Sequence, residues 1–356
     1  MTTGMALQWS RIFEKRGQGA YEEYRIPGLV VTEKGTLVVC YEGRMATMDD
    51  WAVIYITVCR SADDGGTWEK QTIELPEELG GSKEDTLNNP TLIADQGRLH
   101  LLFHWHYERA FHCISDDDGV TWSRPREITE AYREAPYHWN VCATGPGHGI
   151  RTMKGALVAP IWLANGRQID AHRRAHHPSV AGAICSEDGG STWHVGGLMM
   201  TDAIDANETC VTELADGRLL FNVRNCEEDH HRRLAWSSDG GRTMTRLAKA
   251  EALEDPWCFG SMATLADGTV LFANCATTGL GTSSRRINQS IRQSRDGGMT
   301  WEKLVHVDDI GGYADIAVFG SCLYILYERT VSGCIDDLVL KKYRIETDCG
   351  KKCADL

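Results

Sequence analysis

No apolar run in the 356 residues is long enough to cross a membrane, which takes about 20 consecutive, mostly apolar residues in one helix. The N-terminal stretch MTTGMALQWSRIFEKRGQ has no apolar core of the kind that a secretory signal carries, so no signal is expected. No segment has the Pro, Gly or Ser bias of a linker either. The sequence therefore predicts a single domain over residues 1–356, without a membrane partner.

The chain also contains fewer basic than acidic residues. The chain has 37 Lys and Arg against 50 Asp and Glu, which gives a formal net charge of −13. Proteins that bind nucleic acid without sequence preference rely on a basic stripe or patch, so no nucleic-acid partner is expected. An anionic ligand would have to be attracted by a local group of arginines that works against the overall field.

The 13 cysteines include no Cys-x-x-Cys pair. Several of them, such as Cys40, Cys142 and Cys275, lie inside apolar runs, where a free thiol behaves as a small hydrophobic side chain. Unpaired cysteines are typical of reducing compartments. Together with the missing signal, they predict a cytoplasmic location.

A short pattern of the form Ser-x-Asp-x-Gly-x-Thr-Trp recurs five times. Each copy follows a strand-like run, and the fourth ends in Met244 instead of Trp. The copies are SADDGGTW from Ser61, SDDDGVTW from Ser115, SEDGGSTW from Ser186, SSDGGRTM from Ser237 and SRDGGMTW from Ser294. Ser and Asp side chains bond local amides, and Gly supplies the unusual backbone angle, so the pattern predicts hairpin turns that stabilise the fold and take no part in catalysis.

A second pattern, a glycine turn followed by an apolar strand, recurs six times. The glycines stand at positions 35, 97, 155, 217, 268 and 320. The repeat leaves room for four short strands per unit, and no long amphipathic helix intervenes. These features predict an all-β fold, a six-bladed β-propeller. The sixth unit lacks the Asp-containing turn, as expected if a strand near Leu7–Phe13 closes that blade.

The five turns and the segment Tyr-Arg-Ile-Pro at 24–27 together resemble bacterial-type exo-α-sialidases, whose turn repeats are known as Asp boxes. The resemblance extends from about Arg25 to Glu328. It implies hydrolysis of terminal α-linked sialic acid, a sugar whose anomeric carbon is quaternary and carries a carboxylate. The expected partner is a sialylated glycan or oligosaccharide.

The resemblance implies an arginine clamp for the sugar carboxylate, because a guanidinium group binds a carboxylate bidentately. The positions that match the family's clamp are Arg25, Arg224 and Arg286. Arg285 competes with Arg286 for the third position. Glu328, in ILYER, matches a carboxylate that braces the first arginine.

The resemblance also implies a tyrosine nucleophile, because a full negative charge beside the substrate carboxylate would be unfavourable. Tyr313, in GGYADIAV, matches it, although Ala314 stands where the family has Ser. Glu208, in an Asn-Glu pair, matches the base that takes the phenolic proton, since a free Tyr has a pKa of about 10.

The general acid is expected in the loop GRMATMDDWAVI. Asp50 lies six residues after Arg44, where the family places an aspartate that protonates the leaving oxygen and then activates water. Asp49 is the adjacent alternative. Arg44 is expected to border the pocket and to orient the substrate carboxylate or the acid.

Histidines cluster in three places, at 104–106, 171–179 and 230–231. None has a carboxylate or cysteine beside it at a typical ligand spacing, so neither a metal nor another cofactor is expected. Trp51, Trp105, Trp139 and His172 are candidates for the pocket rim.

Two functions other than that of a sialidase also agree with the sequence. A glycosidase for another 2-keto acid sugar, deaminated neuraminic acid or 3-deoxy-octulosonic acid, would carry the same clamp. A noncatalytic glycan-binding propeller would be expected to lack Tyr313, Glu208 or Asp50, and all three are present.

Overall fold

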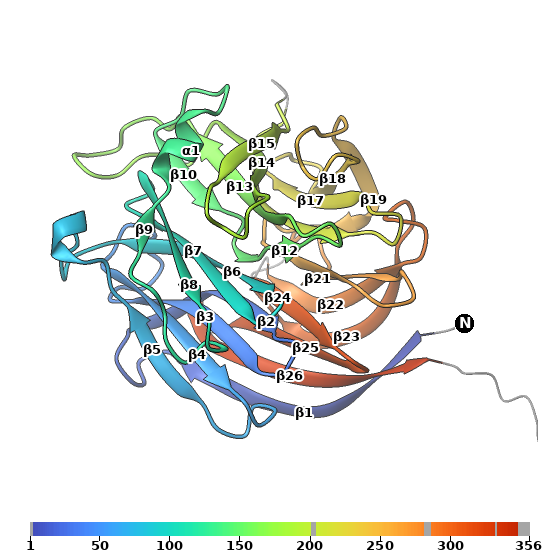
Figure 1. Ribbon diagram of the computed structural model, residues 1–356. Helices are drawn as coiled ribbons and strands as arrows, with labels where there is room; N and C mark the ends of the chain where they lie inside the picture. The colour runs from blue at the N-terminus through green and yellow to red at the C-terminus, as the bar shows by residue number, and fades with distance from the viewer. Residues whose placement is uncertain (1–2, 201–203, 281–285, 332, 348–356) are drawn as a thin grey trace, which may run out of the picture.

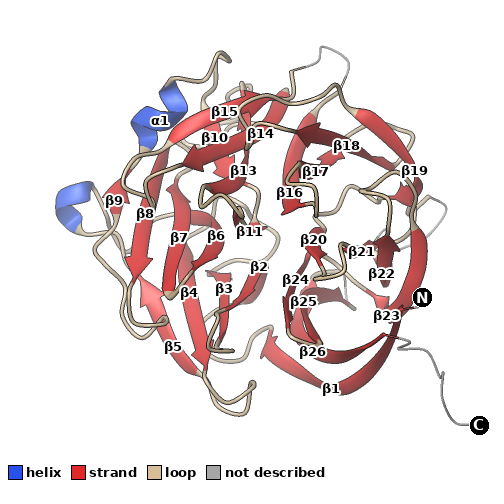
Figure 2. Cartoon of the chain, turned by 45° about the vertical axis from the view of Figure 1, so that its right-hand side comes forward, coloured by secondary structure: helices blue, strands red, loops and turns tan. Residues whose placement is uncertain are grey.

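Six four- or five-stranded sheets are arranged around a common centre, which confirms the predicted six-bladed β-propeller (Figure 2). The computed structural model describes residues 3–200, 204–280, 286–331 and 333–347. The helices within these ranges are a single turn or little more, and none is long and apolar enough to span a bilayer.

The sheets follow one another along the chain, as the colour order in Figure 1 shows. The first blade contains β2 (Glu23–Val31), β3 (Leu37–Arg44), β4 (Ile54–Ser61) and β5 (Glu69–Ile73). The second contains β6 (Leu87–Asp95), β7 (Arg98–Trp105), β8 (Arg109–Ser115), β9 (Arg126–Glu127) and the parallel partner of β6, β11 (Gly147–His148). The third contains β10 (Val141–Thr144), β12 (Ile150–Arg151), β13 (Leu157–Ala164), β14 (Ser179–Ser186) and β15 (His194–Leu198).

The other three blades each have four strands. The fourth contains β16 (Ala206–Glu213), β17 (Leu219–Asn225), β18 (His231–Ser237) and β19 (Ala248–Glu254). The fifth contains β20 (Ser261–Thr264), β21 (Val270–Cys275), β22 (Ile287–Ser294) and β23 (Glu302–Ile310). The sixth contains β24 (Ala314–Phe319), β25 (Cys322–Thr330), β26 (Ile335–Thr347) and β1 (Thr3–Lys15). The described helices are the 3-10 turn Glu77–Leu79 and α1 (Thr129–Arg133).

The ring is closed by strands from opposite ends of the chain. β1 pairs antiparallel with β26, from Gly4 opposite Glu346 to Lys15 opposite Asp337. The expected closing strand near Leu7–Phe13 is therefore confirmed, and it is longer at both ends.

Neighbouring blades are held together by strands that are apolar on both faces. In β3, Val39 and Tyr41 pack toward the sixth blade, in a cluster that includes Leu326. Alternate residues of the same strand, Val38 and Cys40, pack toward the second blade. Successive side chains of a strand point to opposite faces, so a run such as LVVC serves two interfaces at once.

The five Asp-containing turns have the local role that the sequence predicts. In the first, Ser61 Oγ donates to Asp63 Oδ1 (2.7 Å), Gly65 N donates to Ser61 Oγ (2.8 Å), and Thr67 donates to both carboxylate oxygens. The same bonds recur at Asp117, Asp188, Asp239 and Asp296. Each turn joins the two outermost strands of its blade, far from the pocket described below.

The Asp-containing turns are expected to make the fold less stable in acid. The backbone and side-chain hydrogen bonds from Thr67 lower the pKa of Asp63 to about 2, whereas an unfolded Asp has a pKa of about 3.9. Because the folded pKa is the lower one, the stabilisation is present above pH ~4 and is lost as the pH falls toward 2. We expect the free energy of unfolding, from denaturant titrations at pH 6 and pH 3, to fall less in Asp63→Asn than in the wild type. An equal fall in both would contradict this role.

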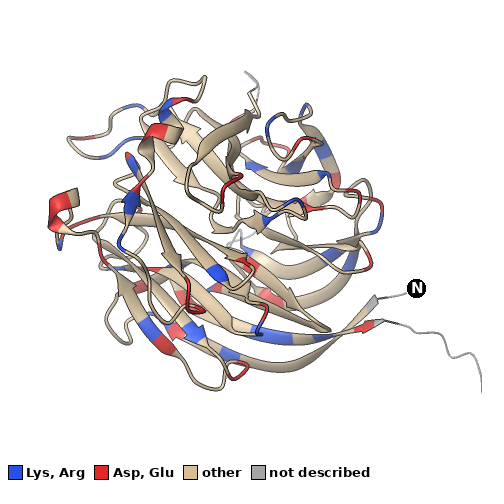
Figure 3. Ribbon diagram, in the orientation of Figure 1, with Lys and Arg blue, Asp and Glu red and all other residues tan. Residues whose placement is uncertain are grey.

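In five blades the glycine turn joins the first and second strands, and in the third blade it joins β12 to β13. All six glycines have positive φ, between 57° and 91°. Lys and Arg are interspersed with Asp and Glu over the blades in the view of Figure 3, without a continuous basic stripe.

Candidate active site

The predicted site residues meet at one end of the central axis. Arg25 and Glu208 lie near the starts of the first strands β2 and β16, and Tyr313 directly precedes β24. Arg224 and Glu328 lie near the ends of the second strands β17 and β25. First and second strands of a blade are antiparallel, so the starts of one set and the ends of the other face the same rim.

The side chain of Glu328 is fully buried beneath this rim and contacts several of the site residues. Its Oε1 accepts from Arg25 Nε (3.1 Å) and from the amide of Ile26 (3.0 Å). Its Oε2 accepts from the amide of Tyr313 (3.2 Å) and lies 3.5 Å from Arg286 Nη1. Burial would raise the pKa of Glu328, but Arg25 and Arg286 outweigh it and lower this pKa, so the group is a carboxylate. Glu328 thus holds Arg25, Arg286 and the backbone of Tyr313 together.

The Glu328→Gln substitution is expected to destabilise the fold by about 3 kcal/mol, because it leaves Arg25 buried with a weakened counter-charge. Denaturant unfolding of both proteins measures this difference. The exposed pair of Arg133 and Glu130 offers a matched control, since surface pairs contribute at most about 1 kcal/mol. If Glu328→Gln lowered stability no more than Glu130→Gln, Glu328 would not be the brace described.

Tyr313 lies at the centre of the arginines. The guanidinium carbons of Arg25, Arg224 and Arg286 are 5.3, 5.9 and 4.9 Å from the centre of its ring. Its hydroxyl donates to Glu208 Oε1 at 2.5 Å and accepts from Arg224 Nη1 at 2.7 Å. Arg224 also forms an ion pair with Glu208.

Burial raises the pKa of Tyr313 above its usual value, and the attraction of Arg224 offsets this only in part. The phenol is therefore protonated at neutral pH, with its proton directed at Glu208. A base in contact with the hydroxyl is what a buried tyrosine needs to act as a nucleophile.

Asp50 faces the arginines from the loop between β3 and β4. Its Oδ1 accepts from Arg44 Nη1 at 2.8 Å and lies 3.8 Å from Arg25 Nη1. Arg44 is almost wholly buried and is held from behind by Glu42, at 2.6 and 2.8 Å. Arg44 therefore holds the Asp50 carboxylate in place.

Asp49 faces elsewhere. Its carboxylate accepts from the amide of Trp51 (2.9 Å) and from Arg173 Nη2 (3.0 Å). Of the two adjacent aspartates, Asp50 is the one that lines the cavity.

Burial alone would raise the pKa of Asp50, but the charges of Arg44 and Arg25 outweigh it and hold this pKa well below the usual range. The side chain is nevertheless 47% exposed toward the cavity. In the free protein Asp50 is thus an anion, and it neutralises part of the positive charge of Arg44 and Arg25.

These residues line a cavity of about 310 Å³. Arg286 lines it, whereas its competitor Arg285 lies outside the described residues. The cavity also contains residues that the sequence did not single out, chiefly Asn89, Tyr107, Trp162 and His176. His176 comes from the histidine-rich segment 171–179, which was the only signal for it.

The four aromatic residues that the sequence suggested for the pocket rim do not line this cavity. Trp51, Trp105 and His172 line a neighbouring hollow of about 880 Å³. Trp51 packs against Tyr107 and His176, with ring centres 4.9 and 5.8 Å apart. Trp139 donates to the carbonyl of Tyr132 (2.9 Å) in the third blade, away from both hollows.

The BNR repeat-like domain family matches residues 35–318, most of the propeller. A sialidase of Bacteroides fragilis (strain YCH46) is 28% identical over 348 residues, which cover 87% of this chain and 60% of that protein. A sialidase of Micromonospora viridifaciens is 28% identical over 317 residues, with coverages of 80% and 46%. The chain thus spans 46% to 60% of the length of these two relatives.

Solved structures have the same fold. Hadza microbial sialidase Hz136 superposes with a TM-score of 0.73 at 27% identity, over 91% of this chain and 66% of that one. Trypanosoma rangeli sialidase in complex with the inhibitor DANA superposes with a TM-score of 0.71 at 19% identity, over 96% and 59%.

Proposed function

The chain belongs to the BNR repeat-like domain family, and we propose that it is an exo-α-sialidase, a glycoside hydrolase that releases terminal α-linked sialic acid. One observation carries the proposal: three arginines surround a tyrosine whose hydroxyl is hydrogen-bonded to a carboxylate. The arginines suit a sugar carboxylate, and the Tyr313–Glu208 pair suits attack on the carbon that bears it.

The first step forms a tyrosyl–sugar bond. Tyr313 Oη attacks the anomeric carbon while Glu208 takes the phenolic proton. The bond from that carbon to the leaving oxygen breaks, and Asp50 gives its proton to this oxygen. The developing positive charge on the sugar ring forms beside the single negative charge that Tyr313 and Glu208 share while the proton moves between them.

The second step reverses these roles. Asp50 takes a proton from water, the water oxygen attacks the anomeric carbon, and Tyr313 Oη leaves and recovers its proton from Glu208. Two displacements at the same carbon retain the configuration of the anomeric centre.

Substrate binding would prepare Asp50 for the first step. A substrate carboxylate bound to Arg25 places a second negative charge near Asp50. It weakens the stabilisation that Arg25 otherwise gives to the Asp50 anion. A nearby like charge raises the pKa of a carboxyl group. The substrate itself therefore favours the protonated Asp50 that its hydrolysis requires.

The cavity size supports action at a chain end. At about 310 Å³ the cavity is near the lower limit for small-molecule sites, which suits one sugar residue. The leaving group would extend past Asp50 toward solvent.

The test is hydrolysis of a fluorogenic aryl α-N-acetylneuraminide, with the product followed by proton NMR. The proposal requires fluorophore release, with the α-anomer of the free sugar appearing before the β-anomer. If the folded protein instead cleaves only the aryl glycoside of deaminated neuraminic acid, the substrate is another 2-keto acid sugar. If it cleaves neither, nor the 3-deoxy-octulosonate glycoside, it is not a hydrolase of this class.

The cytoplasmic location stays a prediction. The eleven cysteines that the structure describes are free thiols, eight of them buried, which supports a reducing compartment.

A further inference from the structure

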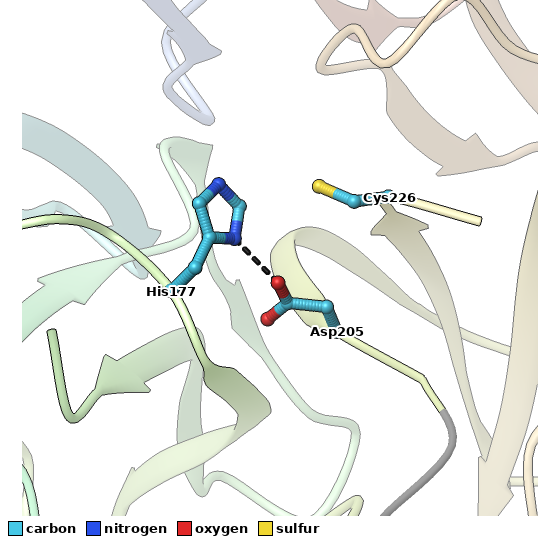
Figure 4. Close-up of side chains that lie close together, drawn as sticks. All are labelled: His177, Asp205 and Cys226. Carbon is cyan, nitrogen blue, oxygen red and sulfur yellow. Dashed lines mark hydrogen bonds and ion pairs between the residues drawn. The ribbon is translucent and has the colours of Figure 1, made fainter. Parts of the chain in front are cut away.

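Three ligand-type side chains from separate segments lie close together (Figure 4), and one of them, His177, lines the cavity of the candidate active site. His177 lies between β13 and β14, Asp205 directly precedes β16, and Cys226 directly follows β17. One potential ligand atom of each residue lies within 4.8 Å of those of the other two. The third and fourth blades thus bring together an imidazole, a carboxylate and a thiol that the sequence places 28 and 21 positions apart.

Asp205 is fixed in place from behind. Its Oδ1 accepts from the amide and the hydroxyl of Ser179, both at 2.6 Å. Its Oδ2 faces His177 Nδ1 at 2.5 Å. One oxygen is therefore anchored in the third blade, and the other is presented to the imidazole.

Cys226 points its thiol toward the same imidazole, as Figure 4 shows. It is one of three described cysteines that are partly exposed, whereas the other eight are buried. Its sulfur accepts a hydrogen bond from Asn207 Nδ2 (3.7 Å) and keeps a lone pair for another partner. A His–Asp ion pair alone gives no reason for a thiol at this place.

We propose that His177, Asp205 and Cys226 bind a divalent cation of the zinc type. Zinc takes N, O and S ligands at about 2.0–2.3 Å in a tetrahedron, so neighbouring ligand atoms lie about 3.3–3.7 Å apart. Shifts of roughly 1 Å would bring the three side chains to these spacings, because all their ligand atoms already lie within 4.8 Å of one another. A soft thiol combined with an imidazole favours zinc over magnesium or calcium.

Charge and access agree with this assignment. A carboxylate and a thiolate together neutralise the two positive charges of the ion, in a protein of net charge −13. The nearby cation Arg224 is already paired with Glu208. The side chain of His177 is 51% exposed, which gives the ion a path from solvent and leaves room for water at the remaining coordination position.

The experiment is titration of the purified protein with Co²⁺, a spectroscopic substitute for zinc, followed by competition with Zn²⁺. We expect a near-ultraviolet thiolate-to-cobalt band and visible bands of tetrahedral intensity, both abolished by Zn²⁺. Cys226→Ser should lose the thiolate band, and His177→Ala should weaken cobalt affinity at least about 10-fold. Neither readout depends on sialidase activity, so this test and that of the proposed function can fail separately.

Cys322→Ser is the matched control, since Cys322 is also partly exposed but lies in the sixth blade. This control should bind cobalt as the wild type does. Wild-type protein without the thiolate band, or spectra and affinities unchanged in both Cys226→Ser and His177→Ala, would overturn the assignment.

Discussion

Replacement of Tyr313 by Phe is expected to lower kcat for an aryl sialoside at least about 10³-fold, because the substitution removes the attacking oxygen and leaves the pocket otherwise intact. The ring stays in place between the three arginines, so the sugar carboxylate keeps its clamp. KM should therefore change much less than kcat. Initial rates over a range of substrate concentrations separate the two.

A control variant distinguishes chemistry from folding. Tyr327 lies in the sixth blade, as Tyr313 does, but outside the cavity. Tyr327→Phe removes a hydroxyl that donates to Asp308 at 2.7 Å. It should be active within a few-fold of the wild type. A second readout is mass spectrometry after incubation with 2,3-difluorosialic acid, which should add mass to the wild type and not to Tyr313→Phe. An adduct in both would assign the nucleophile to another residue.

The Asp50→Asn substitution should have an effect that depends on the leaving group. For a sialyl-lactose substrate the alkoxide needs a proton to leave, so we expect a loss of about 10²–10⁴-fold in kcat. An aryl leaving group needs little assistance, so formation of the tyrosyl–sugar bond should be nearly normal. Its hydrolysis still lacks a base, and stopped-flow fluorescence should show a burst of about one fluorophore per protein before a slow steady state.

Asp49→Asn is the matched control for Asp50. Asp49 contacts Trp51 and Arg173 outside the pocket, so its loss should cost less than about 10-fold on either substrate. Equal losses for both leaving groups in Asp50→Asn, without a burst, would remove Asp50 from the acid/base role.

The architecture was predictable because its signals are local and repeated. Each turn needs a glycine or an aspartate at a fixed place, and five copies of one pattern and six of another leave little choice of fold. The closing strand was predictable by elimination, since only the sixth unit lacks its Asp-containing turn.

The site was predictable only where a family motif covers it. The geometry separates Asp50 from Asp49 by direction: one faces Arg44 and the other Arg173. Tyr107 and His176 reach the cavity from loops of different blades, and no periodicity marks such positions. Likewise His177, Asp205 and Cys226 have no common spacing, because their proximity depends on how the third and fourth blades pack.

The bond between Arg25 and Glu328 joins residues 303 positions apart, and this has a consequence for the order of folding. Strand hairpins within a blade close short loops and can form early, whereas this contact waits until nearly the whole chain has been made and the sixth sheet has docked on the first. Recovered turnover during refolding should therefore lag behind recovered strand structure. Under the proposed function, the return of activity would therefore report a late step of assembly, in which the first and sixth blades meet.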